Sequence, residues 1–233
     1  MTESTNFNPS FKKSFLAIWP ICAGYIPLGL AMGVIGQKAG LSPIEVLCMS
    51  LMVFAGSGQF IAVSMIAAGA SIPSIIITTF MINLRHLLMS SSLAVYFMGE
   101  SRKKISVLSY TIVDETFAVN IDKLKKGNWS IDNSIVVNYM AFTAWAVSTY
   151  SGAYFGKYIP ENSFGLDYAL TAMFISLLVF QLKSSIFFIT AGFSAIIAVI
   201  TSIYLPGNSY IMIASVLAAT FGIILKKKYQ KND

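Results

Sequence analysis

The chain has 233 residues, of which 56% are hydrophobic and only 11% are charged, and its mean hydropathy is +0.71. Soluble domains carry about 25% charged residues, so this composition excludes an ordinary soluble domain. The formal charge of +6 comes from short basic patches beside apolar blocks rather than from a basic face with interleaved aromatic residues, which argues against nucleic acid as a partner.

Apolar blocks long enough to cross a membrane follow one another along the chain. They cover residues 14–36, 44–68, 73–98, 134–157, 166–182, 184–205 and 208–225, with a shorter and more polar block at 105–121. A bilayer core needs roughly 20 apolar residues in a helix, and these blocks lack the period of two expected of barrel strands. The sequence therefore predicts an all-α integral membrane protein, a polytopic bundle of seven to eight helices with interrupted segments.

The predicted organisation is a polar segment at 1–13, one transmembrane helical domain at 14–225 and a basic cytoplasmic tail at 226–233. No cleavable signal peptide is evident, because the first apolar block is too long for one, and no internal repeat is clear. If the block at 105–121 crosses the membrane, the 15 lysines and arginines other than Arg85 divide 10 to 5 between the two sides, and both ends share a side. If it does not cross, they divide 12 to 3, with the N-terminus on the side with fewer charges. Both alternatives place the C-terminal lysines in the cytoplasm.

The first apolar block contains proline and several glycines between residues 24 and 33. Proline removes a hydrogen-bond donor and glycine relaxes the backbone, so we predict an interrupted helix whose free backbone groups bind a substrate's carboxylate and amine. The candidate residues are Gly24, Pro27, Gly29 and Gly33. The alternative is a proline kink in a continuous helix, with glycines as packing notches.

The second block contains Gly56, Ser57 and Gln59 in the stretch 54–60. An amide in the middle of an apolar span must find hydrogen-bond partners, because its desolvation costs a few kcal/mol. We predict a second interruption here that contributes to substrate binding. The alternative is a close helix crossing with Gln59 hydrogen-bonded across it.

The third block carries Asn83, Arg85 and His86 near its centre. An arginine at that depth costs at least about 2.5–3.5 kcal/mol and has to pair or face water. Asn83 is a candidate substrate ligand, and His86, the single histidine, suits proton coupling. The alternatives are a structural ion pair for Arg85 and a packing role for His86.

Acidic residues that could match Arg85 follow in the polar block. Asp114 and Glu115 are flanked by apolar residues, and adjacent side chains on a helix point about 100° apart. One acid could therefore bind Arg85 while the other faces a cavity as a proton carrier. The alternative is an interfacial amphipathic segment with solvated acids. Asp167 is a further candidate for ion pairing, although it could simply cap the helix that starts there.

The sequence contains no catalytic motif. Cys22 and Cys48 lie inside apolar blocks and give neither a disulfide framework nor metal-ligand spacing. No Gly-rich phosphate loop is present, and the single histidine lacks a recognisable nucleophile partner. We therefore expect no enzyme activity, no metal and no cofactor.

Taken together, these motifs resemble the AzlC family, the large subunit of branched-chain amino acid exporters. The resemblance runs in order through residues 24–33, 54–60, 83–86, 114–117 and 165–169. The family usually has Thr before its Asp-Glu pair, where this chain has Val113. The resemblance implies export of leucine, isoleucine, valine and methionine, driven by the proton gradient or another ion gradient. It also implies a small membrane subunit of the AzlD type as partner, in the cytoplasmic membrane of a bacterium.

We therefore interpret the chain as a secondary transporter subunit for hydrophobic amino acids. The segments 24–33 and 56–59 would hold the polar ends of the substrate. Arg85 would pair with Asp114 or Glu115, and protonation of an acid would loosen that pair. The rival interpretation is a membrane scaffold or assembly subunit, with an intramembrane enzyme third.

Overall fold

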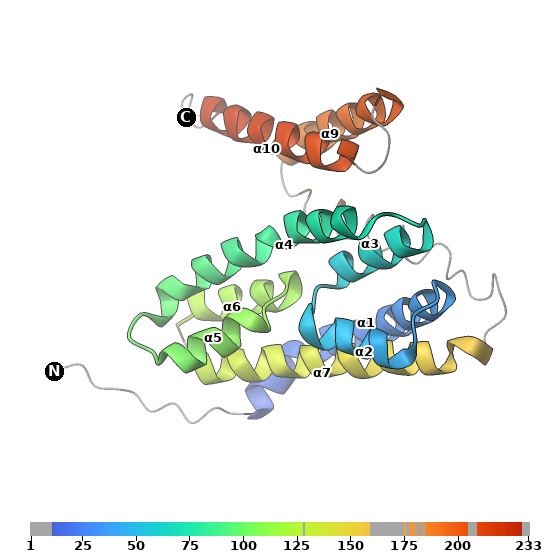
Figure 1. Cartoon of the computed structure of the whole chain (residues 1–233). Coiled ribbons are helices and arrows are strands. Elements are labelled where there is room, and N and C mark those ends of the chain that lie inside the picture. Colours follow the sequence, from blue (N-terminus) through green and yellow to red (C-terminus); the bar gives the residue numbers. More distant parts are fainter. Residues whose placement is uncertain are drawn as a thin grey trace. The chain divides into compact units, whose positions relative to one another are not determined.

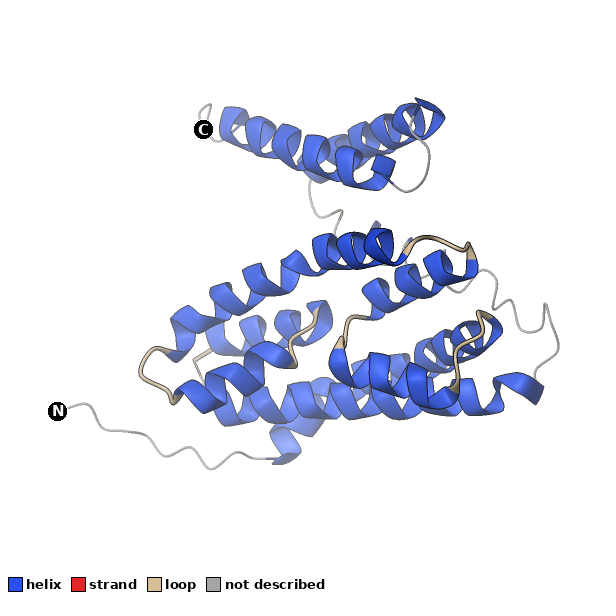
Figure 2. Ribbon diagram, in the orientation of Figure 1, coloured by secondary structure: helices blue, strands red, loops and turns tan. Residues whose placement is uncertain are grey.

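The computed structural model describes residues 11–127, 129–158, 175, 178–179, 182, 185–204 and 209–229. Within these residues the chain is helical, with no strand (Figure 2). In this described part of the chain, three helices are both long and apolar enough to cross a membrane, Phe11–Lys38, Ile72–Phe97 and Ser185–Tyr204. The predicted all-α membrane fold is confirmed.

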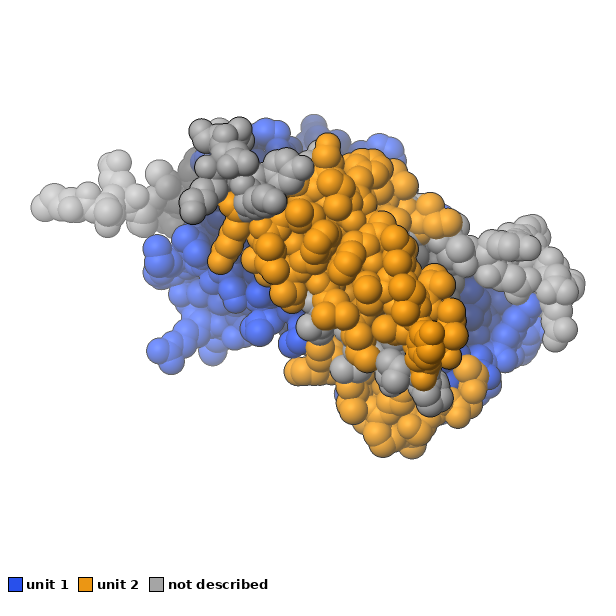
Figure 3. Space-filling view, turned by 90° about the horizontal axis from the view of Figure 1, so that it is seen from above, with its two compact units in different colours: residues 1–67, 82–166 blue, residues 68–81, 167–233 orange. Residues whose placement is uncertain are grey.

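The chain divides into two compact units (Figure 3). The first contains residues 1–67 and 82–166, and the second contains residues 68–81 and 167–233. The division passes through one long helix, α4 (Ile72–Ala94), so its second half belongs to the first unit. Every candidate site residue that the structure describes lies in the first unit.

The first unit is built on two long helices, α1 (Phe11–Lys38) and α7 (Ile131–Phe155), which lie side by side (Figure 1). The Ser14 hydroxyl donates to the Asn133 carbonyl oxygen at 3.3 Å, which joins the start of α1 to the start of α7. Farther along, Gly33 faces the Thr149 backbone. The two helices therefore run in the same direction.

The remaining helices of the first unit are short, apart from α4. They are α2 (Pro43–Met52), α3 (Gly56–Ala67), α5 (Arg102–Tyr110) and α6 (Asp114–Lys125), with the 3₁₀ turns η1 (Val95–Phe97) and η2 (Gly156–Tyr158). At about 1.5 Å per residue, helices of 9 to 12 residues measure about 14–18 Å, which is half the thickness of a bilayer core.

Serine caps define where α2 and α5 begin. The Ser42 side chain accepts from the Glu45 backbone N–H at 3.3 Å, and the Glu45 carboxylate accepts from the Ser42 N–H at 2.7 Å, which is a capping box. The Ser101 side chain accepts in the same way from the Lys104 N–H. These caps satisfy amide groups that a helix leaves free in its first turn.

A hydrophobic cluster joins the second half of α4 to α5 and to the start of α7. Its buried members are Met89, Leu93, Phe97, Leu108, Ile112 and Ile131. This cluster packs the C-terminal end of α4 against the N-terminal end of α7.

The second unit contains the helix pair α9 (Ser185–Tyr204) and α10 (Ser209–Tyr229). Phe193 and Phe221 stack with ring centroids 4.2 Å apart. A methyl group at Gly222 would lie 3.1 Å from the Thr190 methyl carbon, so the absence of a side chain there permits close contact of the two helices.

The predicted interruption of the first block is wrong, because α1 is continuous from Phe11 to Lys38 with Pro20 and Pro27 inside it. Packing explains this. A Cβ at Gly29 would collide with the Ser148 side chain, and a Cβ at Gly33 would collide with the backbone of α7. The glycines let α7 approach closely, and the extensive contact holds α1 helical across its prolines. The structure agrees with the alternative in that the helix is continuous and its glycines serve as packing notches.

Candidate functional site

The predicted interruption of the second block is confirmed at residues 53–55, between α2 and α3 (Figure 2). Phe54 adopts a left-handed backbone conformation with φ of 39°, which is unusual for a bulky residue. Its ring is 2% exposed and packs edge-on against Phe142, with centroids 4.9 Å apart. Tertiary packing therefore holds the chain in a conformation that ends one helix and starts another.

A second interruption lies at residues 111–113, between α5 and α6, and sequence reasoning missed it. The Val113 N–H donates to the Thr116 hydroxyl at 3.0 Å, and that hydroxyl donates to the Val113 carbonyl at 3.1 Å. The signal that could have revealed it is the Asp114-Glu115 pair, because acids favour the first turn of a helix.

Side chains from other helices satisfy carbonyls that the two interruptions leave free. In a continuous helix the Leu51 carbonyl would accept from residue 55 and the Leu108 carbonyl from residue 112. Instead the Tyr110 hydroxyl donates to the Leu51 oxygen, and the Asn138 amide donates to the Leu108 oxygen at 3.2 Å. Because a backbone carbonyl needs a partner both inside the protein and at the surface that faces hydrocarbon, these bonds stabilise both breaks.

Arg85 joins the two interruptions. Its guanidinium donates through one nitrogen to the Asp114 carboxylate, at the start of α6, and through another to the Ser57 hydroxyl, at the start of α3. The side chains of Arg85 and Asp114 are 31% and 28% exposed, so the pair is shielded but can be reached. Of the two acids considered for Arg85, the structure selects Asp114.

Glu115 points to a different partner. The Tyr25 hydroxyl on α1 donates to Glu115 Oε2 at 2.8 Å. Tyr25 is 7% exposed, and its ring packs edge-on against Trp145 with centroids 5.3 Å apart. The neighbouring acids thus contact different helices, as the 100° offset predicts.

Gln59 belongs to a fully buried chain of hydrogen bonds. The Trp145 indole N–H donates to Gln59 Oε1 at 2.8 Å, and Gln59 Nε2 donates to the Ser50 hydroxyl at 2.9 Å. The Ser50 hydroxyl lies 2.8 Å from that of Thr149, which donates to the Ala146 carbonyl, so Ser50 is the donor between them. This geometry is that of a helix crossing, and a substrate role for Gln59 stays a prediction.

The candidate Gly56 and the nearby Gly58 lie at contacts between helices. A Cβ at Gly56 would sit 3.3 Å from the Trp145 ring, and one at Gly58 would sit 2.9 Å from Asn83 Oδ1. Gly24, in contrast, is exposed with no atom within 4 Å of such a Cβ. Pro27 is also exposed. The structure therefore places Gly56 and Gly58 at helix contacts on either side of Ser57 and leaves Gly24 and Pro27 exposed on α1.

Four polar atoms on α4 are buried without a hydrogen-bond partner among the described residues. They are Thr79 Oγ1 and, around the charged centre, Asn83 Oδ1, Arg85 Nε and His86 Nε2. Unpaired buried polar atoms are costly, and they are common where a ligand or ordered water completes the site. Asp167 lies outside the described residues.

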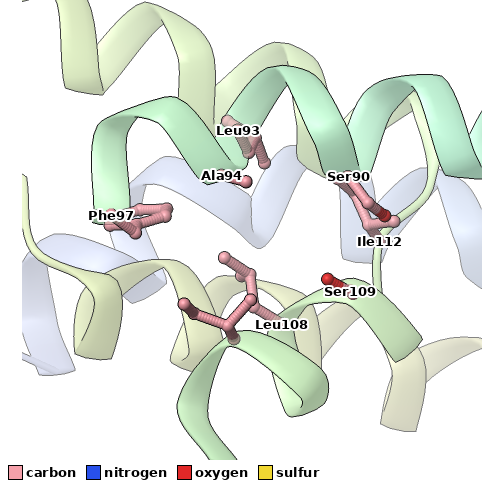
Figure 4. A pocket seen from close by; sticks show the side chains of 8 residues that line it. Ser90, Leu93, Ala94, Phe97, Leu108, Ser109 and Ile112 are labelled. Atoms are coloured by element: carbon pink, nitrogen blue, oxygen red, sulfur yellow. The ribbon is translucent and has the colours of Figure 1, made fainter. Parts of the chain in front are cut away.

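One small cavity of about 10 Å³ lies between α4 and α5 (Figure 4). It is lined by Ser90, Leu93, Ala94, Phe97, Ile105, Leu108, Ser109 and Ile112. A space of this size holds at most one water molecule, so it is too small for an amino acid. In the part of the chain that the structure describes, no three His, Cys, Asp or Glu residues are grouped to bind a metal ion.

Comparison with known proteins identifies the family to which this fold belongs. Residues 20–159 match the model of the family described as AzlC protein. The chain is 27% identical to the branched-chain amino acid transport protein AzlC of Bacillus subtilis, over the whole chain and 92% of that relative. It is 31% identical to the inner membrane protein YgaZ of Escherichia coli, over 80% of each protein. No solved structure shows significant similarity to the chain. Because the family match covers more than half of the residues and includes both interruptions and Arg85, this chain belongs to the AzlC family of membrane proteins.

Proposed function

We propose that this chain is a subunit of a secondary transporter that exports leucine, isoleucine, valine and methionine. The observation that supports this function best is the Arg85 centre, where one guanidinium meets the starts of two half-length helices. Interrupted helices that converge on a charge at mid-depth are typical of carriers for small charged solutes. The B. subtilis relative is named for branched-chain amino acid transport.

The chemistry of this centre suits a carboxylate. Arginine binds carboxylates through two parallel hydrogen bonds, and helix N-termini favour negative charge. Arg85 Nε has no partner among the described residues, and its side chain is 31% exposed. In our proposal the substrate carboxylate binds Arg85 and takes the position that Asp114 holds in its absence.

The amine of the substrate needs acceptors near the same point. Asp114, released from Arg85, and Glu115, one residue farther along the first turn of α6, supply carboxylate oxygens. Asn83 Oδ1 is a further buried acceptor without a partner among the described residues. These groups would complete a site for a zwitterion.

A broad substrate range follows from the apolar surroundings that we expect for the side chain. One methylene changes binding in an apolar pocket by only about 1–3 kcal/mol. Leucine, isoleucine, valine and methionine should therefore share the site with modest differences in affinity.

Proton coupling is the second part of the proposal. Protonation of Asp114 would weaken its bond to Arg85, and His86, the next residue on α4, could exchange that proton. The movement of one proton would then change how tightly the starts of α3 and α6 are held together.

The partner and location in our proposal follow the family. A small AzlD-type membrane subunit completes the carrier, and the complex lies in the cytoplasmic membrane of a bacterium. We place the C-terminal tail, residues 226–233, in the cytoplasm because of its lysines.

Arg85→Ala tests the proposal, and Arg102→Ala is its matched control, because these are the two arginines of the chain and Arg102 is exposed at the start of α5. Cells that produce the chain with its small partner are loaded with labelled leucine, and efflux is measured. Removing one member of a shielded charge pair costs about 2–5 kcal/mol, so we expect Arg85→Ala to lower export by at least about 30-fold. Arg102→Ala should export normally.

Two further measurements separate folding from transport. The double variant Arg85→Glu with Asp114→Arg keeps a charge pair, so it should insert normally even if it does not export. Collapse of the proton gradient in loaded vesicles should stop export by the unmodified protein. Normal export by Arg85→Ala at equal membrane abundance would refute the charged site, and unchanged efflux without a gradient would refute the coupling.

A further inference from the structure

The order and length of the helices repeat within the first part of the chain. α1, α2 and α3 contain 28, 10 and 12 residues, and α4, α5 and α6 contain 23, 9 and 12. We infer that residues 11–67 and 72–125 are two copies of one unit, a long helix followed by a broken hairpin, inserted in opposite orientations. The two hairpins then reach Arg85 from opposite sides of the membrane.

Local landmarks recur at nearly constant spacing. Gly40 and Gly99 both have a left-handed backbone, with φ of 94° and 97°, and each precedes by two residues the serine that caps the next helix. The interruptions at 53–55 and 111–113 are 58 residues apart, and so are the starts of α3 and α6. The side chains are mostly different, which explains why no repeat is clear in the sequence.

The two long helices run in opposite directions along α7. The start of α1 bonds to the start of α7 through Ser14 and Asn133, and near the end of α1 Gln37 faces Gly156, just beyond the end of α7. On α4, Arg85 contacts the interruptions, whereas Leu93 belongs to the cluster that includes Ile131, at the start of α7. α4 therefore runs antiparallel to α1 and α7, towards the end of the bundle at which those two helices begin.

The second hairpin enters and leaves at that same end. Lys104 at the start of α5 forms an ion pair of 2.6 Å with Asp132 at the start of α7. Lys123 and Lys126, at the end of α6, line one surface hollow together with Lys13, at the start of α1. The block at 105–121 thus turns back at its interruption and does not cross.

The first hairpin is attached to the opposite end. The Leu41 N–H donates to the Gly36 carbonyl at 3.0 Å, and a Cβ at Gly36 would lie 2.9 Å from Val46, so α2 starts beside the end of α1. Across the interruption, Gln59 Nε2 on α3 donates to the Ser50 hydroxyl on α2 at 2.9 Å, and α3 runs back towards the end where α2 begins (Figure 1). The block at 44–68 is therefore also a hairpin.

Basic residues identify the cytoplasmic side. In the described segments up to residue 158, the end of the bundle where α1 and α7 begin carries Lys12, Lys13, Arg102, Lys103, Lys104, Lys123, Lys125 and Lys126. The other end carries Lys38 and Lys157. A division of eight to two is as uneven as the 12-to-3 alternative drawn from the apolar blocks and more uneven than the 10-to-5 one, and it places the N-terminus in the cytoplasm.

Each hairpin contributes one contact to Arg85. Ser57 comes from the hairpin that enters from outside, and Asp114 comes from the hairpin that enters from the cytoplasm. Inverted repeats of this kind let a carrier exchange two mirror-related states around a fixed site. This last step rests on the proposed transport function, whereas the repeat and its orientation do not.

Single cysteines at the four hairpin ends test the inference. In a background with Cys22→Ala and Cys48→Ala, cysteine replaces Ile44 or Ala68 at the first hairpin and Glu100 or Lys125 at the second, all of which are exposed. A membrane-impermeant maleimide is added to right-side-out vesicles, and labelling is compared before and after permeabilisation. Labelling in denaturant confirms that each cysteine is present and reactive.

We expect Ile44→Cys and Ala68→Cys to label in sealed vesicles, and Glu100→Cys and Lys125→Cys to label only after permeabilisation. If the members of either pair label from opposite sides, that block crosses the membrane and the repeat is refuted. If all four label from one side, the opposite orientation is refuted, and the reversed pattern overturns the cytoplasmic N-terminus. Labelling needs no transport, so its result is independent of the export assay.

Discussion

Substituting alanine for glycine at three positions of α1 measures how closely this helix must approach its neighbours. A Cβ at Gly33 would overlap the backbone of Thr149 and Ala153 and lie 2.8 Å from the Gly152 carbonyl carbon. A Cβ at Gly36 would lie 2.9 Å from a Val46 methyl group, and one at Gly24 would have no neighbour within 4 Å. The three variants add the same methyl group to the same helix.

The expected magnitudes follow from what can move. Overpacking costs about 1–3 kcal/mol, and a clash with backbone cannot be relieved by rotating a side chain, so Gly33→Ala should reach about 3 kcal/mol. Val46 can shift, so Gly36→Ala should cost about 1 kcal/mol. Gly24→Ala should be neutral or stabilise by up to about 1 kcal/mol, because alanine is the better helix former.

Apparent melting temperatures of the purified variants in detergent provide the assay, with labelled leucine export measured in parallel. We expect stability to fall in the order Gly24→Ala, Gly36→Ala, Gly33→Ala, and export to fall with it. If Gly33→Ala melts like Gly24→Ala, the close contact between α1 and α7 is not formed. If Gly33→Ala is stable but does not export, Gly33 acts on the substrate instead.

Two buried amides provide the remaining tests. Gln59→Leu leaves the Trp145 indole N–H without an acceptor, and Asn138→Leu removes the amide that accepts from Asn120 Nδ2 and donates to the Leu108 carbonyl. Each unpaired buried group costs about 1–3 kcal/mol, so both variants should melt well below the unmodified protein, with Asn138→Leu also exposing the second interruption to proteolysis. Thr143→Val is the control, because the Thr143 hydroxyl is exposed and bonds within its own helix. If Gln59→Leu or Asn138→Leu melts at the same temperature as this control, the proposed role of that amide is wrong.

Sequence patterns predicted the class of this protein and the composition of its charged centre. Apolar blocks around an isolated Arg85 require both a membrane and an acidic partner, because a lone guanidinium in hydrocarbon is too costly. The same reasoning proposed Asp114 or Glu115 as that partner. The stretch 54–60, with Gly56, Ser57 and Gln59, indicated a helix interruption, which the structure places at residues 53–55.

The path of the chain through the membrane was not predictable from these patterns. Hydropathy measures the apolar length of a block, and a hairpin of two half-length helices is as apolar as one crossing helix. The prolines and glycines of α1 show the same limit, since they permit a break but equally permit close packing against α7.

Composition and spacing along the chain therefore determined that this is a helical membrane protein with a positive charge at mid-depth that must be compensated. Only the tertiary structure decided which acid does so, which helices are interrupted and where each hairpin turns back. The physical reason is that those choices depend on contacts between residues far apart in the sequence. The bonds from Tyr110 to Leu51 and from Asn138 to Leu108 satisfy the broken helices, and neither bond leaves a local signal in the sequence.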